Sequence, residues 1–291
     1  MKAVKGRMLF GGVHIPDEKP LAKAARVAEL PAPTEVAVAM KQSVGRPAIP
    51  CVEVGDDVAR GQLIGRADGE VSSNVFASIS GKVTKIAELE NECGCRDTYV
   101  VIEGDGEGRE QHLPPLPDPT AEEIVARVRD AGIVGLGGAG FPTAVKLQPK
   151  APVDTLIING AECEPYLTCD YRIMIENTDE IVRGARYIAK ALGAPKILMG
   201  IEVNKPDAIA KMQSAIDVAG IEVKQLPCRY PQGAEKVLIE TCTGREVPFP
   251  GLPSDVGVIV MNVTSTAFVG KYLEPGMPLT PKRLTVDGDI V

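Results

Sequence analysis

Two kinds of hydrophobic pattern divide this chain into two parts. Between residues 47 and 104, apolar and polar positions alternate over short stretches that are broken by Gly and Asp. Alternation with a period of two is typical of half-buried β-strands. The stretches are 51–58, 61–65, 75–83 and 99–102. This pattern predicts a small all-β module.

Beyond this module the pattern changes to amphipathic helices that alternate with short apolar strands. Helices are expected at 120–130, 179–192, 205–219 and 233–242, and strands at 155–159, 196–200, 221–225 and 256–262. Thr120 and Thr178 stand at positions suited to helix N-caps. Such alternation predicts a mostly parallel sheet covered on both faces, with ligands bound at the carboxyl ends of its strands.

A proline-rich connector, Leu113–Pro119, separates the two patterns, because proline removes backbone donors and favours extended chain. We expect an N-terminal region at 1–115 and an α/β domain at 116–275. Residues 284–291 predict a strand and turn that lack a partner, so 276–291 is expected to begin a segment that the natural polypeptide or its complex completes.

Composition narrows the possible functions. The formal net charge is −7 and the chain has no run rich in Lys and Arg, which argues against nucleic-acid binding. No window is long and apolar enough for a membrane span or a signal core, so we expect a cytoplasmic chain that reaches membranes only through partners.

The seven cysteines indicate reduced thiols, because their number is odd and their spacing irregular. Cys93 and Cys95 are separated by one residue, too few for the usual two-thiolate metal clip, and no Cys-x-x-Cys-x-x-Cys run is present. Cys163 and Cys169 have no neighbouring cationic residue that would mark a reactive thiol. No metal site is expected.

The order of signals in the β module resembles the barrel-sandwich fold of biotinyl and lipoyl carrier domains. Val54–Leu63 reads Val-Gly-Asp-x-Val-x-x-Gly-Gln-Leu, and Ala77–Val83 reads Ala-Ser-Ile-Ser-Gly-Lys-Val. Carrier domains attach their cofactor to a lysine at a hairpin tip. The corresponding tip, Asp68–Ser73, contains no lysine, so carrier function is not expected.

A glycine-rich loop lies between the first expected helix and the first expected strand of the second half. Its glycines are Gly135, Gly137, Gly138 and Gly140. Glycines let backbone amides approach an anion, while a helix that starts near Pro142 and the charge of Lys146 would add positive potential. Only Ile133 and Val134 precede the loop as possible strand, so the dinucleotide fingerprint is not satisfied. The loop predicts phosphate binding, with a tight structural turn as the alternative.

Further polar residues follow the expected strands or begin a helix. They are Asn159, Glu162, Glu164, Gly233, Glu235 and Asn262. Amide and carboxylate groups at strand ends can bond ribose or ribityl hydroxyls and a carboxamide. A solvated acidic turn is the alternative for 159–166.

Several motifs, in order over nearly the whole chain, together resemble RnfC, a component of the Rnf electron-transport complex. They are Phe10–His14, Gly135–Thr143 with Lys146, Ile158–Tyr166, Tyr230–Gly233 with Glu235 and Lys236, and Thr243–Pro248. The glycine-rich loop and the Asn-x-x-Glu-x-Glu-Pro element also recur in the flavoprotein subunit of respiratory complex I and in a cobalamin-reductase relative.

This resemblance implies a mixed fold, α/β plus all-β: a barrel-sandwich hybrid domain followed by a Rossmann-like α/β domain with a mostly parallel sheet. It implies FMN and NAD(H) as cofactors. The residues expected around the flavin phosphate and ring are Gly135, Gly137, Gly138, Gly140 and Lys146, with Asn159, Glu162, Gly233, Glu235 and Asn262 completing the pocket. Phe141 is expected to stack on the nicotinamide nucleotide and Glu164 to bond it. No catalytic side chain is expected, because hydride passes directly between the cofactors.

The resemblance further implies an NADH-dependent flavin oxidoreductase subunit of an ion-translocating NAD:ferredoxin complex. Such a chain would lie on the cytoplasmic face of the membrane, held by other subunits and linked indirectly to ferredoxin. Ala161 replaces an Asp of the complex I version, which predicts one ribityl contact fewer. The family continues into a β-grasp module and two [4Fe–4S] clusters, for which this chain has no ligands. The alternatives are a cobalamin-reductase-like flavoprotein and a non-catalytic, truncated assembly subunit.

Overall fold

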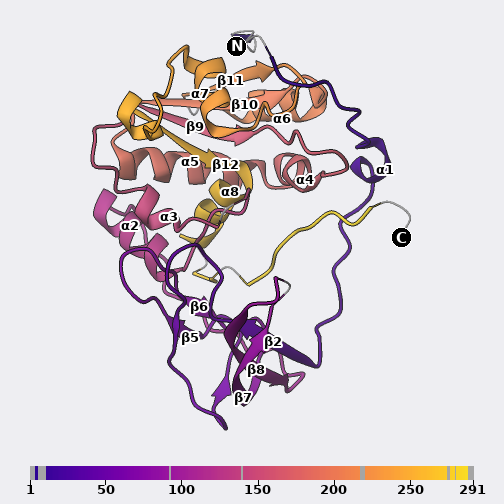
Figure 1. The fold of residues 1–291 in the computed structure, drawn as a ribbon, viewed down its shortest axis with the longest axis vertical. Helices are drawn as coiled ribbons and strands as arrows, with labels where there is room; N and C mark the ends of the chain where they lie inside the picture. Colours follow the sequence, from indigo (N-terminus) through magenta and orange to yellow (C-terminus); the bar gives the residue numbers. More distant parts are fainter. Residues whose placement is uncertain are drawn as a thin grey trace.

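The structure is a computed structural model that describes residues 4–5, 11–91, 93–138, 140–216, 220–273, 276–278 and 280–287. Phe10 of the N-terminal motif and residues 217–219 and 288–291 of the expected elements lie outside these ranges. Figure 1 shows an all-β domain at one end of the molecule and a larger α/β domain at the other.

The all-β domain has two antiparallel sheets. One has the order β2-β8-β7-β4, built from Glu35–Ala39, Arg96–Gly104, Gly81–Glu90 and Asp57–Val58. The other has the order β3-β5-β6, built from Ile49–Pro50, Leu63–Arg66 and Val75–Phe76. The sheets enclose a core that includes Val58, Ile64, Val83, Val100 and Ile102, each with 0% of its surface exposed. The expected barrel-sandwich hybrid domain is confirmed.

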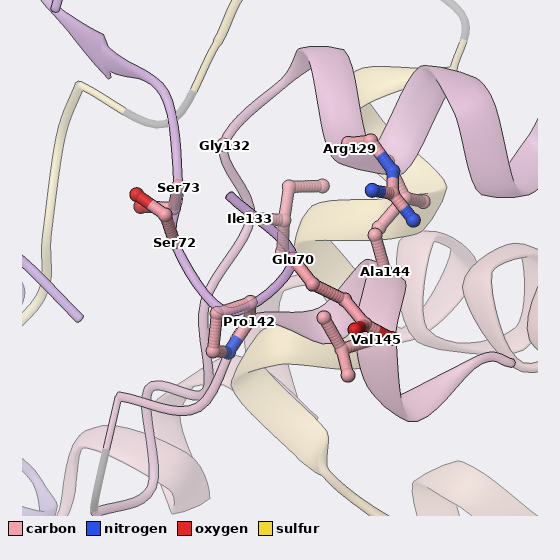
Figure 2. A pocket seen from close by; sticks show the side chains of 10 residues that line it. Glu70, Ser72, Ser73, Arg129, Gly132, Ile133, Pro142, Ala144 and Val145 are labelled. Atoms are coloured by element: carbon pink, nitrogen blue, oxygen red, sulfur yellow. The ribbon is translucent and has the colours of Figure 1, made fainter. Parts of the chain in front are cut away.

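The loop between β5 and β6 contains the lysine-free tip at 68–73, and it packs against the α/β domain. Asn74 Nδ2 donates to Asp130 O at 3.1 Å. Gly132 has φ +62°, and a Cβ there would lie 2.3 Å from Asn74 O, so only glycine allows this approach. Figure 2 shows Ser72 and Ser73 opposite the 132–145 segment. The position that carries a cofactor in carrier domains is therefore a contact between domains here.

The α/β domain contains a five-stranded sheet of order β1-β11-β10-β9-β12 in which every pairing is parallel. The strands are Val4–Lys5, Ile221–Leu226, Lys196–Glu202, Thr155–Gly160 and Val258–Asn262. The expected mostly parallel sheet is confirmed, and the four expected strands agree with β9 to β12 to within two residues. β1 was not expected, since a two-residue strand leaves no periodic pattern.

Helices cover both faces of this sheet, because alternate residues of its strands point to opposite sides. Leu156 and Ile158 face α2 (Ala121–Asp130), α4 (Cys169–Glu176), α5 (Thr178–Leu192), α6 (Pro206–Ile216) and α8 (Val263–Tyr272). Ile157 and Leu198 face α7 (Glu235–Thr243). The short helices are α1 (Pro20–Lys23), α3 (Thr143–Lys146) and the 3-10 turn η1 (Pro253–Val256).

The two expected helix caps have different outcomes. Thr120 caps α2 in a capping box with Glu123, as expected. Thr178 does not cap α5: it is the first helical residue, and its hydroxyl donates to Met174 O at 2.9 Å. Only Asn177 lies between the end of α4 and the start of α5. The Thr178 hydroxyl therefore bonds a carbonyl of α4 and does not cap α5.

Two glycines bring α5 and α8, which cover the same face of the sheet, into backbone contact. A Cβ on Gly184 would lie 1.9 Å from Thr266 O, and one on Gly270 would lie 2.0 Å from Glu180 O. This close crossing fixes α8, whose first residue follows the last residue of β12.

Residues 11–23, which we call the N-terminal segment, run over the α/β domain before the chain enters the all-β domain (Figure 1). Val13 and Tyr230 exchange two backbone hydrogen bonds of 2.8 Å. At the other end of the chain, the strand expected from residue 284 is absent over 284–287. These residues instead make side-chain contacts: Thr285 Oγ1 accepts from Thr168 N at 3.0 Å, and the neighbouring Arg283 pairs with Glu176 at 2.7 Å.

No helix within the described ranges combines the length and the apolar character needed to cross a membrane.

Candidate functional site

The carboxyl ends of the parallel strands bring the expected polar residues of three segments together. Asn159 of β9 stands beside Asn262 of β12 and Gly200 of β10 in the sheet register. Glu162 follows β9 by two residues, and Glu202 ends β10. Ligands of doubly wound sheets bind at this edge, so the strand ends form the floor of the candidate site.

The glycine-rich loop lies over this floor and is tied to α8. Gly135 N donates to Phe141 O at 2.9 Å, and Leu136 N donates to Ser265 Oγ at 2.9 Å. Among the described residues of this loop, the one strand-like pairing is the bridge of Val134 with Pro142, and the sequence predicted no more than a short strand here. The loop is therefore a closed turn held above the start of α8.

Two glycines of this loop fit different requirements. A Cβ on Gly137 would lie 2.6 Å from Asn262 Nδ2, so a larger residue would displace that amide. Gly138 is exposed with φ +152°, and a Cβ there would meet nothing within 4 Å. Within the described part of the chain, the N–H groups of Gly137 and Gly138 have no hydrogen-bond partner. They are free to bind an anion.

The helix expected to follow the loop is one turn, α3, whose N-cap is Pro142. A four-residue helix adds little dipole, so the free amides and Lys146 carry most of the positive potential here. Thr143 Oγ1 is buried without a partner among the described residues.

Asn262 is both the last residue of β12 and the N-cap of α8. Its Oδ1 accepts from Thr264 N at 2.9 Å and Ser265 N at 3.2 Å. Its Nδ2 donates to Asp170 Oδ2 at 2.8 Å, and Thr264 Oγ1 donates to the other oxygen of Asp170 at 2.5 Å. Burial raises the pKa of Asp170, against these hydrogen bonds.

Sequence reasoning missed Asp170. It lies in the first turn of α4, a helix that no pattern in the sequence had predicted, and its partners lie more than 90 residues away. An acidic residue shortly after the Glu162–Tyr166 motif was the only available signal.

Asn159 connects β9 to the start of α7. Its Nδ2 donates to Gly233 O at 2.9 Å, and its Oδ1 accepts from Ala161 N at 3.0 Å. A Cβ on Gly233 would lie 3.1 Å from Ala161 O, tighter than an ordinary contact. The NH2 and the C=O of the Asn159 amide therefore both hold the turn around Ala161. A ligand that contacts Asn159, as the sequence predicted, would have to share these two groups with the turn.

Lys146 and Glu235, both expected to contact the flavin, are partners of each other. Lys146 Nζ lies 2.9 Å from Glu235 Oε1, and the side chains are 30% and 41% exposed. A half-exposed ion pair of this kind is weak, so an incoming phosphate can compete with Glu235 for the ammonium.

Glu162 belongs to a buried charge cluster, which we define as Lys19, Glu162, Glu202 and Lys205. Each member has 5% or less of its surface exposed. Lys19 Nζ lies 3.6 Å from Glu162 Oε2, Glu202 Oε2 accepts from Glu162 N at 3.0 Å, and Lys205 Nζ pairs with Glu202. Burial raises the pKa of Glu162 to about 7, and the charge of Lys19 opposes this rise. Sequence reasoning missed the other three members.

Glu162 Oε1 accepts from Asp170 N at 2.9 Å, in the first turn of α4. Glu162 Oε2, although buried, has no hydrogen-bond partner among the described residues. An ionised carboxylate at a helix N-terminus is favoured by the backbone dipoles. Glu162 thus links the charge cluster to the helix that carries Asp170.

The rim of the site is aromatic and acidic. Phe141 is 39% exposed and Tyr166 43%. Glu164 is exposed, and its charge raises the pKa of the neighbouring Tyr230 hydroxyl. Phe141 and Glu164, the two residues expected to meet a nicotinamide nucleotide, are therefore accessible to a ligand.

Two small pockets lie where the all-β domain meets the α/β domain, beside the ends of the glycine-rich loop, and Figure 2 shows the first of them. Their lining residues include Glu70, Arg129 and Pro142 in one and Gln42, Asn74 and Lys282 in the other. None of the predicted site residues lines either pocket. Both pockets result from the packing of the hairpin tip against the α/β domain. The candidate site lies elsewhere, at the carboxyl ends of β9, β10 and β12.

The donors at this edge fit a flavin mononucleotide. The free amides of Gly137 and Gly138 and the partly exposed ammonium of Lys146 are groups suited to a phosphate. Fold and site together define a nucleotide-binding α/β protein with an attached barrel-sandwich domain.

Comparison with known proteins assigns the family. Residues 8–107 match the RnfC barrel sandwich hybrid domain, and residues 128–271 match the Nuo51 FMN-binding domain. The chain belongs to the RnfC family, and its curated relatives are named as subunits of ion-translocating oxidoreductase complexes.

Two curated relatives illustrate the extent of the match. The chain is 43% identical over 289 residues to the RnfC component of the proton-translocating ferredoxin:NAD(+) oxidoreductase complex of Clostridium ljungdahlii, covering 97% of this chain and 63% of the relative. It is 42% identical over 295 residues to the RnfC component of the Na(+)-translocating complex of Acetobacterium woodii, covering 99% and 67%. The chain thus spans about two thirds of the length of these relatives.

Among solved structures, an NAD+-reducing [NiFe]-hydrogenase in the air-oxidized state is 28% identical, with a TM-score of 0.46 over 53% of this chain and 31% of that chain.

Proposed function

We propose that this chain binds FMN at the edge formed by β9, β10 and β12 and exchanges hydride with NAD(H) there, as the nucleotide-binding part of an Rnf-type complex. The observation that supports this most strongly is the glycine-rich loop held over Asn262 within a domain of the FMN-binding family. The relatives are named as subunits of ferredoxin:NAD(+) oxidoreductase complexes. Other subunits of such a complex, at the cytoplasmic face of a membrane, are the partners we propose.

In this proposal the side chains position ligands and carry out no bond-making. FMN, when bound, would supply the hydride-accepting ring. The amides of Gly137 and Gly138 and the ammonium of Lys146 would hold its phosphate. Phe141 and Glu164 would hold the nicotinamide nucleotide at the open rim, where both side chains are exposed.

Titration of the purified chain with FMN, followed by anaerobic addition of NADH, tests this function. Binding is expected to quench flavin fluorescence, and NADH is expected to bleach the flavin absorbance. Binding without bleaching would contradict the hydride exchange with NADH. Failure to bind would contradict the flavin site itself and would favour the non-catalytic assembly role.

Replacing Lys146 by Ala is expected to weaken FMN binding by about 1.5–3 kcal/mol, because a charge-assisted bond to phosphate is lost. The carboxylate of Glu235 would also lose its partner and would then repel the phosphate. Fluorescence titration measures the change. Lys150→Ala removes an exposed lysine four positions away and should leave the affinity unchanged. Equal affinities of wild type and Lys146→Ala would remove Lys146 from the phosphate site.

Replacing Phe141 by Ala is expected to slow flavin reduction by NADH about tenfold, the equivalent of one lost stacking contact. FMN affinity should stay near that of wild type, because the backbone of residue 141 keeps its bond to Gly135. Stopped-flow absorbance gives the rate. Phe249→Ala, which removes a side chain that is 94% exposed, is the control. Loss of FMN instead of loss of rate would place Phe141 in the flavin pocket.

A further inference from the structure

The N-terminal segment crosses the carboxyl ends of three strands of the α/β sheet. Val13 bonds Tyr230, four residues beyond β11. Asp17 Oδ2 accepts from Asn204 Nδ2 at 2.9 Å, two residues beyond β10. Asp17 O accepts from Tyr166 N at 2.9 Å in the turn after β9. A segment that precedes the all-β domain in the chain therefore forms part of the surroundings of the candidate site.

Lys19 is the deepest contact of this segment. Its side chain is 5% exposed, and its Nζ donates to Glu164 O at 3.0 Å and to Leu167 O. The third neighbour is Glu162 Oε2 at 3.6 Å. An ammonium has three donors and is costly to bury without acceptors, so this site is built for a lysine. Its three neighbours all belong to the 162–168 loop, which contains two predicted site residues.

Contacts continue from Lys19 to the glycine-rich loop. Glu162 Oε1 accepts from Asp170 N, Asp170 Oδ2 accepts from Asn262 Nδ2, and Asn262 lies against Gly137. The two hydrogen bonds of this chain, at Glu162 and at Asp170, lie in the half-buried part of the site, where water screens them little. A change at Lys19 can therefore alter the position of groups that it does not touch.

We propose that Lys19 is a positioning residue of the nucleotide site, which holds the 162–168 loop and the Glu162 carboxylate in the arrangement that receives the ligand. This inference deepens the proposed function and rests on it for the ligand, whereas the hold on the loop is a property of the chain alone.

The charges around Glu162 give this role a pH signature. Lys19 faces it from the N-terminal segment, Asp170 and Cys169 from α4, and Glu202 and Lys205 from the end of β10 and the following turn. Burial raises the pKa of Glu162 to about 7, and Lys19 is the largest influence that lowers it. Without Lys19 the pKa of Glu162 rises further. The ionised form, which accepts from the start of α4, then persists only at higher pH.

The experiment compares wild type with Lys19→Met and with Lys23→Met as the matched control. Lys23 lies on the same segment, but its ammonium contacts the Tyr171 ring at 4.7 Å and Asp207 at 3.7 Å rather than Glu162. Hydrogen exchange of peptides covering 162–176 is measured without ligand. The dissociation constant of FMN is then measured by fluorescence from pH 6 to 9.

For Lys19→Met we expect exchange at the Tyr166 and Asp170 amides to accelerate about tenfold or more through local opening. In wild type, FMN affinity is expected to fall as the pH drops through the pKa of Glu162, about 7. This midpoint should move upward by about one pH unit in Lys19→Met. It should disappear in Glu162→Gln, which cannot titrate, and Lys23→Met should match wild type in both measurements.

Exchange and pH midpoint both equal to those of wild type would overturn the inference. If wild type binds no FMN at any pH, the proposed function fails, while the exchange measurement still decides the hold of Lys19 on the loop. Should Lys19→Met not fold, Lys19→Gln takes its place, because an amide keeps a donor for Leu167 O but carries no charge. For Lys19→Gln as well, faster exchange and a higher pH midpoint would support the inference, and the absence of both would refute it.

Discussion

A Gly184→Ala variant is expected to lose about 3 kcal/mol or more of its free energy of unfolding, since overpacking between two backbones cannot be relieved by a rotamer change. The new Cβ would lie 1.9 Å from Thr266 O and 2.9 Å from Gly270 N, so α5 and α8 would have to separate. Because the site residue Asn262 caps the start of α8, FMN binding is expected to weaken as well. Urea unfolding followed by circular dichroism gives the stability.

The matched control for Gly184 is a change on the exposed side of the same helix. Lys190→Ala removes a side chain that is 47% exposed and pairs with Asp118, so it should have little effect. Equal unfolding midpoints for Gly184→Ala and wild type would mean that α5 and α8 are not in backbone contact in solution.

The second large effect is expected at Lys205. Replacing it by Met would leave the Glu202 carboxylate buried without its cation, and breaking a buried pair in this way costs about 3–5 kcal/mol. Glu202 has 2% of its surface exposed and also accepts from Glu162 N, so the end of β10 and the turn after β9 would loosen together. Thermal and urea unfolding measure the loss.

A double variant distinguishes this loss of charge pairing from a simple loss of packing. Lys205→Met combined with Glu202→Gln removes the unpaired charge, so it should recover a large part of the stability that Lys205→Met loses. If the double variant loses as much free energy of unfolding as the two single variants lose in sum, the charge pair contributes nothing beyond packing.

The sheet could be predicted from the sequence because its strands are short apolar runs bounded by turns. β9 to β12 each lie close to their expected positions, and α2 carries the cap expected at Thr120. α8 was missed because it starts with Val263, Thr264, Ser265 and Thr266, residues with low helix propensity. Its start is stabilised by the Asn262 side chain, which the pattern had assigned to the end of a strand.

The sequence predicted which residues of the chain belong to the candidate site, but not which residues they contact. Strand ends located Asn159, Glu162 and Asn262, because the topology of a parallel sheet collects them at one edge. Their partners were not predictable: Lys146 pairs with Glu235 across 89 residues, and Lys19 bonds Glu164 O across 145. No local pattern encodes contacts at these separations, since periodicity reports only neighbours within one helix or strand.

The β1 strand has a consequence for the order in which the molecule is made. Val4 pairs with Lys224, so 224 − 4 or 220 residues separate them. At roughly 5–20 residues per second, a ribosome needs on the order of 10–45 s between the two. The all-β domain at 35–104 can close during that interval. Val4 and Lys5 therefore cannot pair before β11 has been made, and the edge of β11 that they cover stays open to chaperones or to misassembly until the two segments meet.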